Sequence, residues 1–173
     1  EGKAMKLFGA LLVIFGFGAG GLILANAYRE RLAHLKQFIR GLNLLAVEVG
    51  YAMNPLETAL RRVAQNLNGP VADFFAAAAR QLAVLNNAGE AWQRTLKDFQ
   101  GKLTLTETDW ACLAELSALL GVTDQANQIR AIRENVARLE AVVQESQEKV
   151  KVNERVLRYA GFILGMILVL VLY

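Results

Sequence analysis

The sequence predicts an all-α protein, a bundle of about six helices flanked by one membrane helix at each end. Three observations lead to this prediction. Apolar residues recur at alternating steps of three and four through most of the chain, which is the period of a helix that packs on one face. Proline occurs only twice in 173 residues, and glycine is scarce between the two ends. Apolar runs without charge occupy both ends, so we expect the first and last bundle helices to be continuous with membrane spans.

The N-terminal apolar run predicts a transmembrane helix over residues 7–27, after a short tail of residues 1–6. It carries no charge and has about the ~20 residues that a bilayer crossing needs. Gly16 and Gly20 stand in GxxxG spacing, which would let another membrane helix approach closely. A cleavable signal peptide is the alternative, because Ala25-Asn26-Ala27 has the pattern of a cleavage site. The run is longer than the usual signal core of ~7 to 15 residues, which favours the span.

The first bundle helix is expected over about residues 29–52, followed by a break at Asn54-Pro55. Asn54 is a good N-cap, Pro55 suits the first helical position, and Glu57 stands where a capping box places its acid. Asn68-Gly69-Pro70 separates the second helix from the third. Across the helices before residue 121, the residues expected to face inward are Leu32, Leu35, Ile39, Leu42, Ala46, Val49, Met53, Leu56, Leu60, Val63, Leu67, Val71, Phe74, Phe75, Ala78, Leu82, Leu85, Trp92, Leu96, Phe99, Trp110, Leu113, Leu116 and Leu120.

Two further turns divide the second half of the bundle. Residues 86–89 end the third helix, and a connector over 101–106 follows the fourth. Thr106 with Asp109 opens a fifth helix, and Gly121 is placed to cap its end. Trp92 and Trp110 are best explained as core anchors, with partner binding as the minority interpretation.

The final helix begins at Thr123-Asp124 and predicts a heptad seam that runs into the apolar C-terminus. The bundle domain is expected over 28–157 and a second membrane helix over 158–173. Counted from Tyr159, that span covers only ~22 Å of a ~30 Å hydrocarbon core, so a re-entrant tail remains an alternative. The seam residues are Ile129, Ile132, Val136, Leu139, Val143, Ser146, Val150, Asn153 and Leu157.

The distribution of charged residues predicts where the bundle lies and argues against one class of function. Lys and Arg flank the bundle side of both spans more densely than the termini, so the positive-inside rule places the bundle in the cytoplasm and predicts contact with membrane lipid. The chain has 19 Lys and Arg against 16 Asp and Glu, a net charge of +3 without a basic stripe. That near balance argues against nucleic-acid binding.

The residue inventory offers no catalytic, metal or cofactor site, so we expect a protein that is not an enzyme and uses no cofactor. His34 is the single histidine and is expected to be a surface or interfacial residue, since a zinc site needs several ligands. Cys112 is the single cysteine and is expected to be a packed small side chain. No phosphate-binding glycine loop is present, so the chain is not itself an ATPase.

Surface charges supply the partner-binding candidates. By default these are ordinary solvated residues. The functional interpretation is that they dock and register another protein. The candidates are Arg61, Arg62, Arg130, Arg133 and Glu134.

Several short motifs give a resemblance to a known family. Residues 42–60 read LNLLAVEVGYAMNPLETAL, which resembles the LxxLExEIxYxxTPLxEAL signature of the stage III sporulation protein AB family. Glu90-Ala91-Trp92 matches its EAW, and Leu120-Gly121, Asp124 and Gln128 fit its LGxxDxxxQ. The resemblance covers essentially the chain from residue 5 onward. Departures are Asn54 in place of Thr, with Ala46 and Thr58 at places that other residues often take.

The resemblance implies a component of the channel apparatus that endospore-forming bacteria build between mother cell and forespore. Family members lie in the mother-cell membrane, and their cytoplasmic domain is similar to those of platform protein F in type II secretion and type IV pilus machines. By that similarity the domain would relay between a hexameric ATPase, stage III sporulation protein AA, and other channel components. Self-association stays open. The alternative from another class is an extracytoplasmic helical sensor held between two spans.

Overall fold

A computed structural model describes residues 2–52, 54–121 and 124–147, with side chains from residue 26 onward. Within these residues the chain is helical and contains no named strand, only one isolated bridge between Gln100 and Leu103. The predicted all-helical class is therefore confirmed. The elements are α1 (Gly2–Gly50), α2 (Leu56–Gln65), α3 (Pro70–Leu85), α4 (Ala88–Phe99), α5 (Glu107–Glu115), the 3-10 turn η1 (Leu116–Ala118) and a final helix over residues 125–147.

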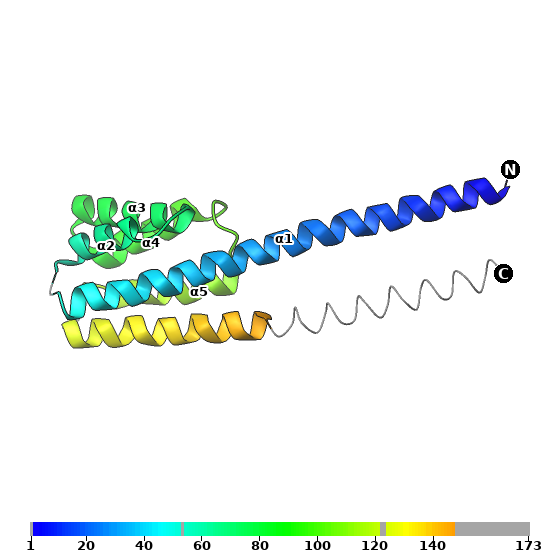
Figure 1. Cartoon of the computed structure of the whole chain (residues 1–173). Helices are drawn as coiled ribbons and strands as arrows, with labels where there is room; N and C mark the ends of the chain where they lie inside the picture. The colour runs from blue at the N-terminus through cyan, green and yellow to red at the C-terminus, as the bar shows by residue number, and fades with distance from the viewer. Residues whose placement is uncertain (1, 53, 122–123, 148–173) are drawn as a thin grey trace.

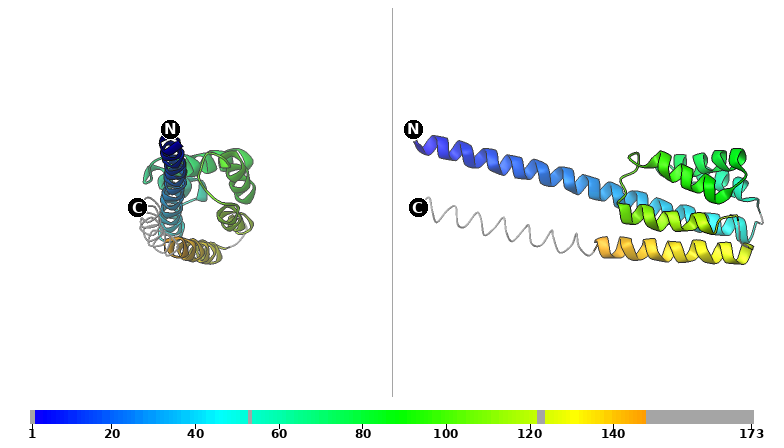
Figure 2. Two further views of the ribbon diagram at one scale, coloured as in Figure 1. Left: turned by 90° about the vertical axis from the view of Figure 1, so that its right-hand side faces the viewer. Right: turned by 180° about the vertical axis from the view of Figure 1, so that it is seen from behind.

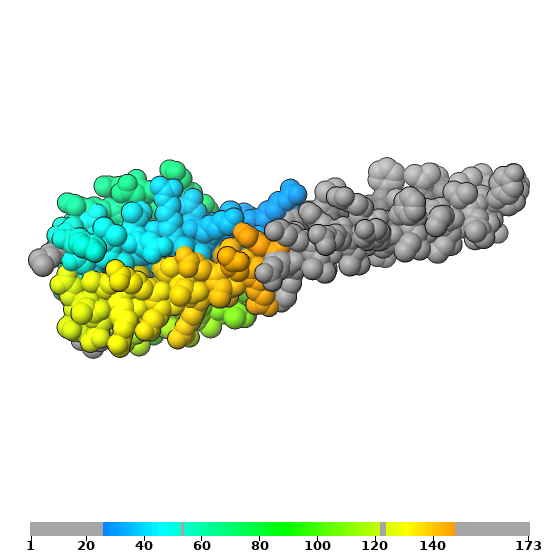
Figure 3. Space-filling view, turned by 60° about the horizontal axis from the view of Figure 1, so that its bottom comes forward, coloured from blue at the N-terminus to red at the C-terminus, as the bar shows by residue number. Residues whose placement is uncertain are grey.

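The long helix α1 organises the bundle and continues well beyond it toward the N-terminus (Figure 1). The final helix runs antiparallel beside α1, with α5 close to both, while α2, α3 and α4 pack on the other side of α1 (Figures 1 and 2). The space-filling view shows the final helix lying along α1 over the length of the bundle (Figure 3). The predicted antiparallel pair of long helices is thus confirmed over the described residues. We call α1 and the final helix the two rods.

The two ends of the bundle, here called the base and the tip, are formed by different chain segments. The base is the end where Tyr28 of α1 meets Ser146 of the final helix, with a 2.5 Å hydrogen bond between the Tyr28 hydroxyl and the Ser146 carbonyl oxygen. The tip is the opposite end, where Gly50 meets Gln125. Because α1 begins far outside the bundle, it enters the bundle at the base, and the described part of the final helix ends at the base.

An aromatic cluster fills the core between α1, α3 and α4. The Phe74 ring lies 5.1 Å from that of Phe38, 5.0 Å from that of Trp92 and 5.5 Å from that of Phe99, all edge-on. Trp92 also donates a 2.8 Å hydrogen bond from Nε1 to the carbonyl oxygen of Leu113, so its one polar atom is satisfied inside the core. Both tryptophans are buried, as predicted for core anchors.

The predicted inward faces are confirmed wherever side chains are described, since each of those residues is buried or partly buried. Met53, Val150, Asn153 and Leu157 lie outside the described residues. Phe38 and Leu45, which are fully buried in α1, were not predicted. The reason is that α1 is covered on two sides, by α2 and α3 and by the final helix. Its buried arc is therefore wider than one seam.

Most predicted helix starts are confirmed, but the cap at Asn54 and the place of Pro55 at the first helical position are wrong. Pro55, with ψ of 142°, is the last residue before α2, so Asn54 stands one position too early to cap it. Its amide instead donates to Glu48 Oε2 at 2.7 Å. Pro70 begins α3, and α5 has the full capping box of Thr106 and Asp109. The carboxylate of Asp109 accepts from the backbone N–H of Thr106 at 2.9 Å.

Among the described residues, no helix combines the length and apolarity of a membrane crossing. The span predicted over 7–27, with Gly16 and Gly20, lies almost wholly where only the backbone of α1 is described. The span predicted over 158–173 lies outside the described residues.

Candidate partner-binding site

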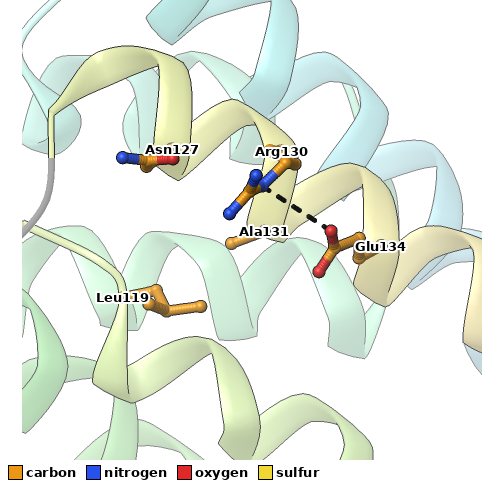
Figure 4. A pocket seen from close by; sticks show the side chains of 5 residues that line it. All are labelled: Leu119, Asn127, Arg130, Ala131 and Glu134. Atoms are coloured by element: carbon orange, nitrogen blue, oxygen red, sulfur yellow. Dashed lines mark ion pairs between the residues drawn. The ribbon is translucent and has the colours of Figure 1, made fainter.

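The outer face of the final helix carries three of the predicted partner-binding residues. Arg130, Arg133 and Glu134 are exposed, and Arg130 Nε lies 3.7 Å from Glu134 Oε1, a distance typical of a loose surface pair. Arg130 and Glu134 border an open pocket of about 240 Å³ that also has Leu119 and Ala131 in its lining (Figure 4). Charged groups at the rim of a small apolar surface can orient a protein partner. We call these three exposed charges the rod patch.

The other two predicted residues lie on α2 and are paired within the chain. Arg61 contacts Glu57 at 2.5 Å, and Arg62 contacts Glu48 at 3.3 Å. Because α2 and the final helix lie on different sides of α1, the five predicted residues form two patches (Figure 1). The structure does not bring them into one cluster.

Exposed apolar side chains mark the tip, and they were not predicted from the sequence. Tyr51, just after α1, is 83% exposed, and Val84, near the end of α3, is 78% exposed. Val47 and Leu119 are also large and exposed. Ala88 touches the position that a side chain on Gly121 would take, so the start of α4 lies beside the segment that leads into the final helix. The sequence did contain a sign of part of this surface. Val47 and Tyr51 are four residues apart, so they share a helix face, and neither lies on the apolar seam of α1.

The single histidine is buried, not on the surface. The His34 Nδ1 atom accepts a 3.2 Å hydrogen bond from the backbone N–H of Thr104, which holds the connector after α4 against α1. Burial lowers the pKa of His34, and the nearby Glu30 carboxylate opposes that change without reversing it. His34 is therefore neutral at physiological pH and acts as an acceptor inside the fold.

Cys112 is half-buried between α5 and the final helix. The Asn135 amide donates to the Cys112 carbonyl oxygen at 2.5 Å and lies 3.6 Å from its sulfur atom. Burial raises the pKa of the Cys112 thiol, so the reactive thiolate is disfavoured. This environment agrees with the predicted packed side chain. Over the described residues, no three His, Cys, Asp or Glu side chains gather as metal ligands would.

A buried polar cluster at the base was not predicted. Arg31 of α1 and Asp109 of α5 form a two-pronged ion pair, with Nε to Oδ2 at 2.7 Å and the terminal nitrogen to Oδ1 at 2.8 Å. The other terminal nitrogen of Arg31 reaches Ser146 Oγ at 3.3 Å. With the Tyr28 hydroxyl on the Ser146 carbonyl oxygen, these bonds join α1, α5 and the final helix. We call Tyr28, Arg31, Asp109 and Ser146 the base cluster.

The base cluster holds its charges in their ionised forms. Burial would raise the pKa of Asp109, but hydrogen bonds from Arg31 and Thr106 outweigh it, so this pKa lies below its usual value. The hydrogen bond to Asp109 likewise raises the pKa of Arg31, although desolvation acts against it. The sequence predicts Asp109 only as a cap and Arg31 only as a charge beside the span, because 78 positions separate the partners.

Comparison with known proteins decides the family. The sequence model for stage III sporulation protein AB matches residues 6–173. The chain belongs to this family. Stage III sporulation protein AB of Bacillus subtilis (strain 168) is 30% identical over 169 residues, covering 97% of this chain and 99% of that protein. A solved structure of stage III sporulation protein AB superposes with a TM-score of 0.66 at 28% identity, covering 70% of this chain and 97% of that chain.

Membership in stage III sporulation protein AB confirms the resemblance read from residues 42–60 and the two later motifs. It gives the chain a role in sporulation, and its relatives are named as sporulation proteins, not as enzymes.

Proposed function

We propose that this member of stage III sporulation protein AB is a non-enzymatic membrane platform, an adaptor between a cytoplasmic ATPase and the channel apparatus between mother cell and forespore. The observation that carries the proposal is the continuity of α1, one helix from Gly2 to Gly50 that both leaves the bundle and forms its central rod. At 1.5 Å per residue, such a helix is about 70 Å long.

The rods suit a relay because neither is interrupted by a turn over its described length, 2–50 for α1 and 125–147 for the final helix. An uninterrupted helix transmits displacement along its axis, whereas a flexible segment absorbs it. Side-chain hydrogen bonds tie the rods to each other at base and tip. A partner that moves the bundle would therefore move both rods together.

The rod patch is the better candidate for the partner contact. Among the described residues Arg133 takes part in no ion pair, and Arg130 has only the loose contact with Glu134, so both cations are available to an acidic partner surface. Arg61 and Arg62 are occupied by their own carboxylates. We assign the partner as the hexameric ATPase named stage III sporulation protein AA. The other channel components would then meet the membrane part of the chain.

A binding measurement tests the partner assignment. The full chain in detergent is titrated with purified stage III sporulation protein AA from the same organism. Reversing two charges, Arg130→Glu with Arg133→Glu, is expected to weaken binding by at least about tenfold, since like charges then face the partner. The matched control is Arg80→Glu, an exposed arginine on α3. Equal binding by both variants and the unchanged chain contradicts the rod patch, and no binding by any of them contradicts the partner.

The proposed location is the mother-cell membrane, with the bundle in the cytoplasm. Cys112 is a poor accessibility reporter because it is half-buried and its thiol pKa is raised. The exposed Gln144→Cys, in a Cys112→Ala background, should react with a membrane-impermeant thiol reagent only after cells are permeabilised. Reaction in intact cells would instead favour the extracytoplasmic sensor.

A further inference from the structure

The base cluster differs from the other ion pairs of the described residues in its burial. The Asp109 side chain is 0% exposed and that of Arg31 is 16% exposed, whereas every other paired carboxylate is at least partly open to solvent. The cluster also lies at the base, the end of the bundle beyond which α1 continues toward the N-terminus. Solubility accounts for exposed charges. It does not account for a buried and fully paired set of charges where three helices meet.

Stability alone does not explain the base cluster. A buried ion pair loses its hydration on folding, and replacing one with apolar residues of similar volume is often neutral or even stabilising. Apolar side chains, however, would not fix how the helices are placed relative to one another. The two-pronged contact of Arg31 with Asp109 is satisfied in one relative placement of α1 and α5, and the remaining nitrogen reaches Ser146 in one placement of the final helix.

The interface between the rods needs such a device because its apolar pattern repeats. Ile132, Val136, Leu139 and Val143 are buried at alternating steps of four and three, and Leu35, Leu42 and Val49 are buried seven residues apart on α1, so both patterns repeat every heptad. If one rod shifted along the other by one heptad, each aliphatic contact would be replaced by another of the same kind. A polar group at a heptad interface is the best-attested means of excluding such shifts.

We propose that the base cluster is a register lock: Tyr28, Arg31, Asp109 and Ser146 fix the axial position of α1 against α5 and the final helix. Its importance for the relay rests on the proposed function, but the register itself is a property of the fold. The chemical class of the device is a buried guanidinium–carboxylate pair, completed by two hydroxyl groups.

A distance measurement between the rods tests the lock. Spin labels are placed on the exposed positions Lys36→Cys and Gln144→Cys in a Cys112→Ala background, with the full chain in detergent. The otherwise unaltered chain should give one narrow distance distribution. Arg31→Met with Asp109→Leu should keep the helical content while the distribution broadens or gains components shifted by about one heptad, ~10 Å along the axis. An unchanged narrow distribution overturns the proposal.

Two further variants keep the test decisive. The matched control is Arg138→Met with Glu115→Leu, which removes an exposed ion pair between α5 and the final helix and should leave the distribution narrow. Broadening in this control as well would overturn a specific role for the base cluster. If the buried double variant does not fold, Tyr28→Phe with Ser146→Ala removes only the two hydroxyl groups and should broaden the distribution partially. No change there counts against the lock. The distance distribution and the helical content are both measured without the ATPase, so failure of the lock and failure of the proposed function are distinguishable.

Discussion

The two ends of the rod pair are built differently. At the base, buried charges join three helices, with Asp109 enclosed by Arg31 and Thr106. At the tip, the Gln125 amide donates to the main-chain carbonyl oxygens of Val49 and Gly50, which any sequence would provide, and Tyr51 stands exposed nearby. The base therefore depends on a matched pair of side chains, Arg31 and Asp109, whereas at the tip only Gln125 contributes its side chain. In the proposed relay, the base would be the fixed end and the tip an end with surface open to a partner.

The largest effect is expected at the base. Asp109→Ala leaves the Arg31 guanidinium without its carboxylate and removes the side-chain half of the capping box that Asp109 supplies to α5, so the free energy of unfolding should fall by about 3 kcal/mol or more. Chemical denaturation of the full chain in detergent measures it. The control Glu134→Ala removes an exposed carboxylate and should cost well under about 1 kcal/mol. Equal losses in the two variants would show that the base cluster is energetically ordinary.

At the tip the expected loss is smaller. Gln125→Ala removes hydrogen bonds to main-chain oxygens without burying an unpaired charge, and should cost about 1 kcal/mol. The same denaturation experiment applies, with the exposed Gln144→Ala as the control, expected to be near neutral. A loss at Gln125 as large as that at Asp109 would remove the distinction between the two ends.

His34 adds a pH dependence close to the base. Its pKa in the folded chain is lowered, so below about pH 6.5 the unfolded chain takes up a proton before the folded chain does. Stability should therefore fall as the pH drops from 6.5 toward the folded pKa. His34→Gln retains an acceptor for the Thr104 N–H and does not titrate. Its melting temperature should fall less than that of the unchanged chain over this range. Identical slopes would contradict the buried neutral histidine.

The smallest effect on stability is expected at the exposed tip surface. Tyr51→Ser should change the free energy of unfolding by less than about 0.5 kcal/mol, because the ring is 83% exposed. If the tip extends the partner contact, this variant should still weaken binding in a titration with the ATPase. Unchanged binding would confine the contact to the rod patch.

Features that depend on residues close together in the sequence were predicted correctly. Helix order, the seam of the final helix and the capping box of Thr106 follow from neighbours within a few positions, and all are confirmed over the described residues. The Asn54 cap failed because a capping prediction depends on where the helix begins to within one residue.

The candidate site was less predictable. The pairing of Arg31 with Asp109 joins distant segments, and a single sequence carries no periodic signal for it. Burial of Phe38 depended on how many neighbours surround α1, which is a property of the assembled bundle. The residues of the rod patch were predicted from their charge, but their availability could be judged only once their ion pairs were placed.

In the proposed relay, the rods transmit displacement instead of merely tethering the bundle. This relay is tested most directly by inserting seven residues into α1 after Ala27, before the first residue of the base cluster. A helix-forming insert of Ala, Glu and Lys keeps the rod continuous and nearly preserves its facing, since seven residues make close to two turns. A Gly/Ser insert of the same length keeps the tether but not the rod.

Heat-resistant spores are then counted in the native host carrying each version in place of its own copy, with membrane levels of the protein compared by immunoblot. A relay through the rods predicts spores with the helix-forming insert and a severe loss with the Gly/Ser insert at equal protein levels. Spore counts at the unaltered level with the Gly/Ser insert would contradict the relay.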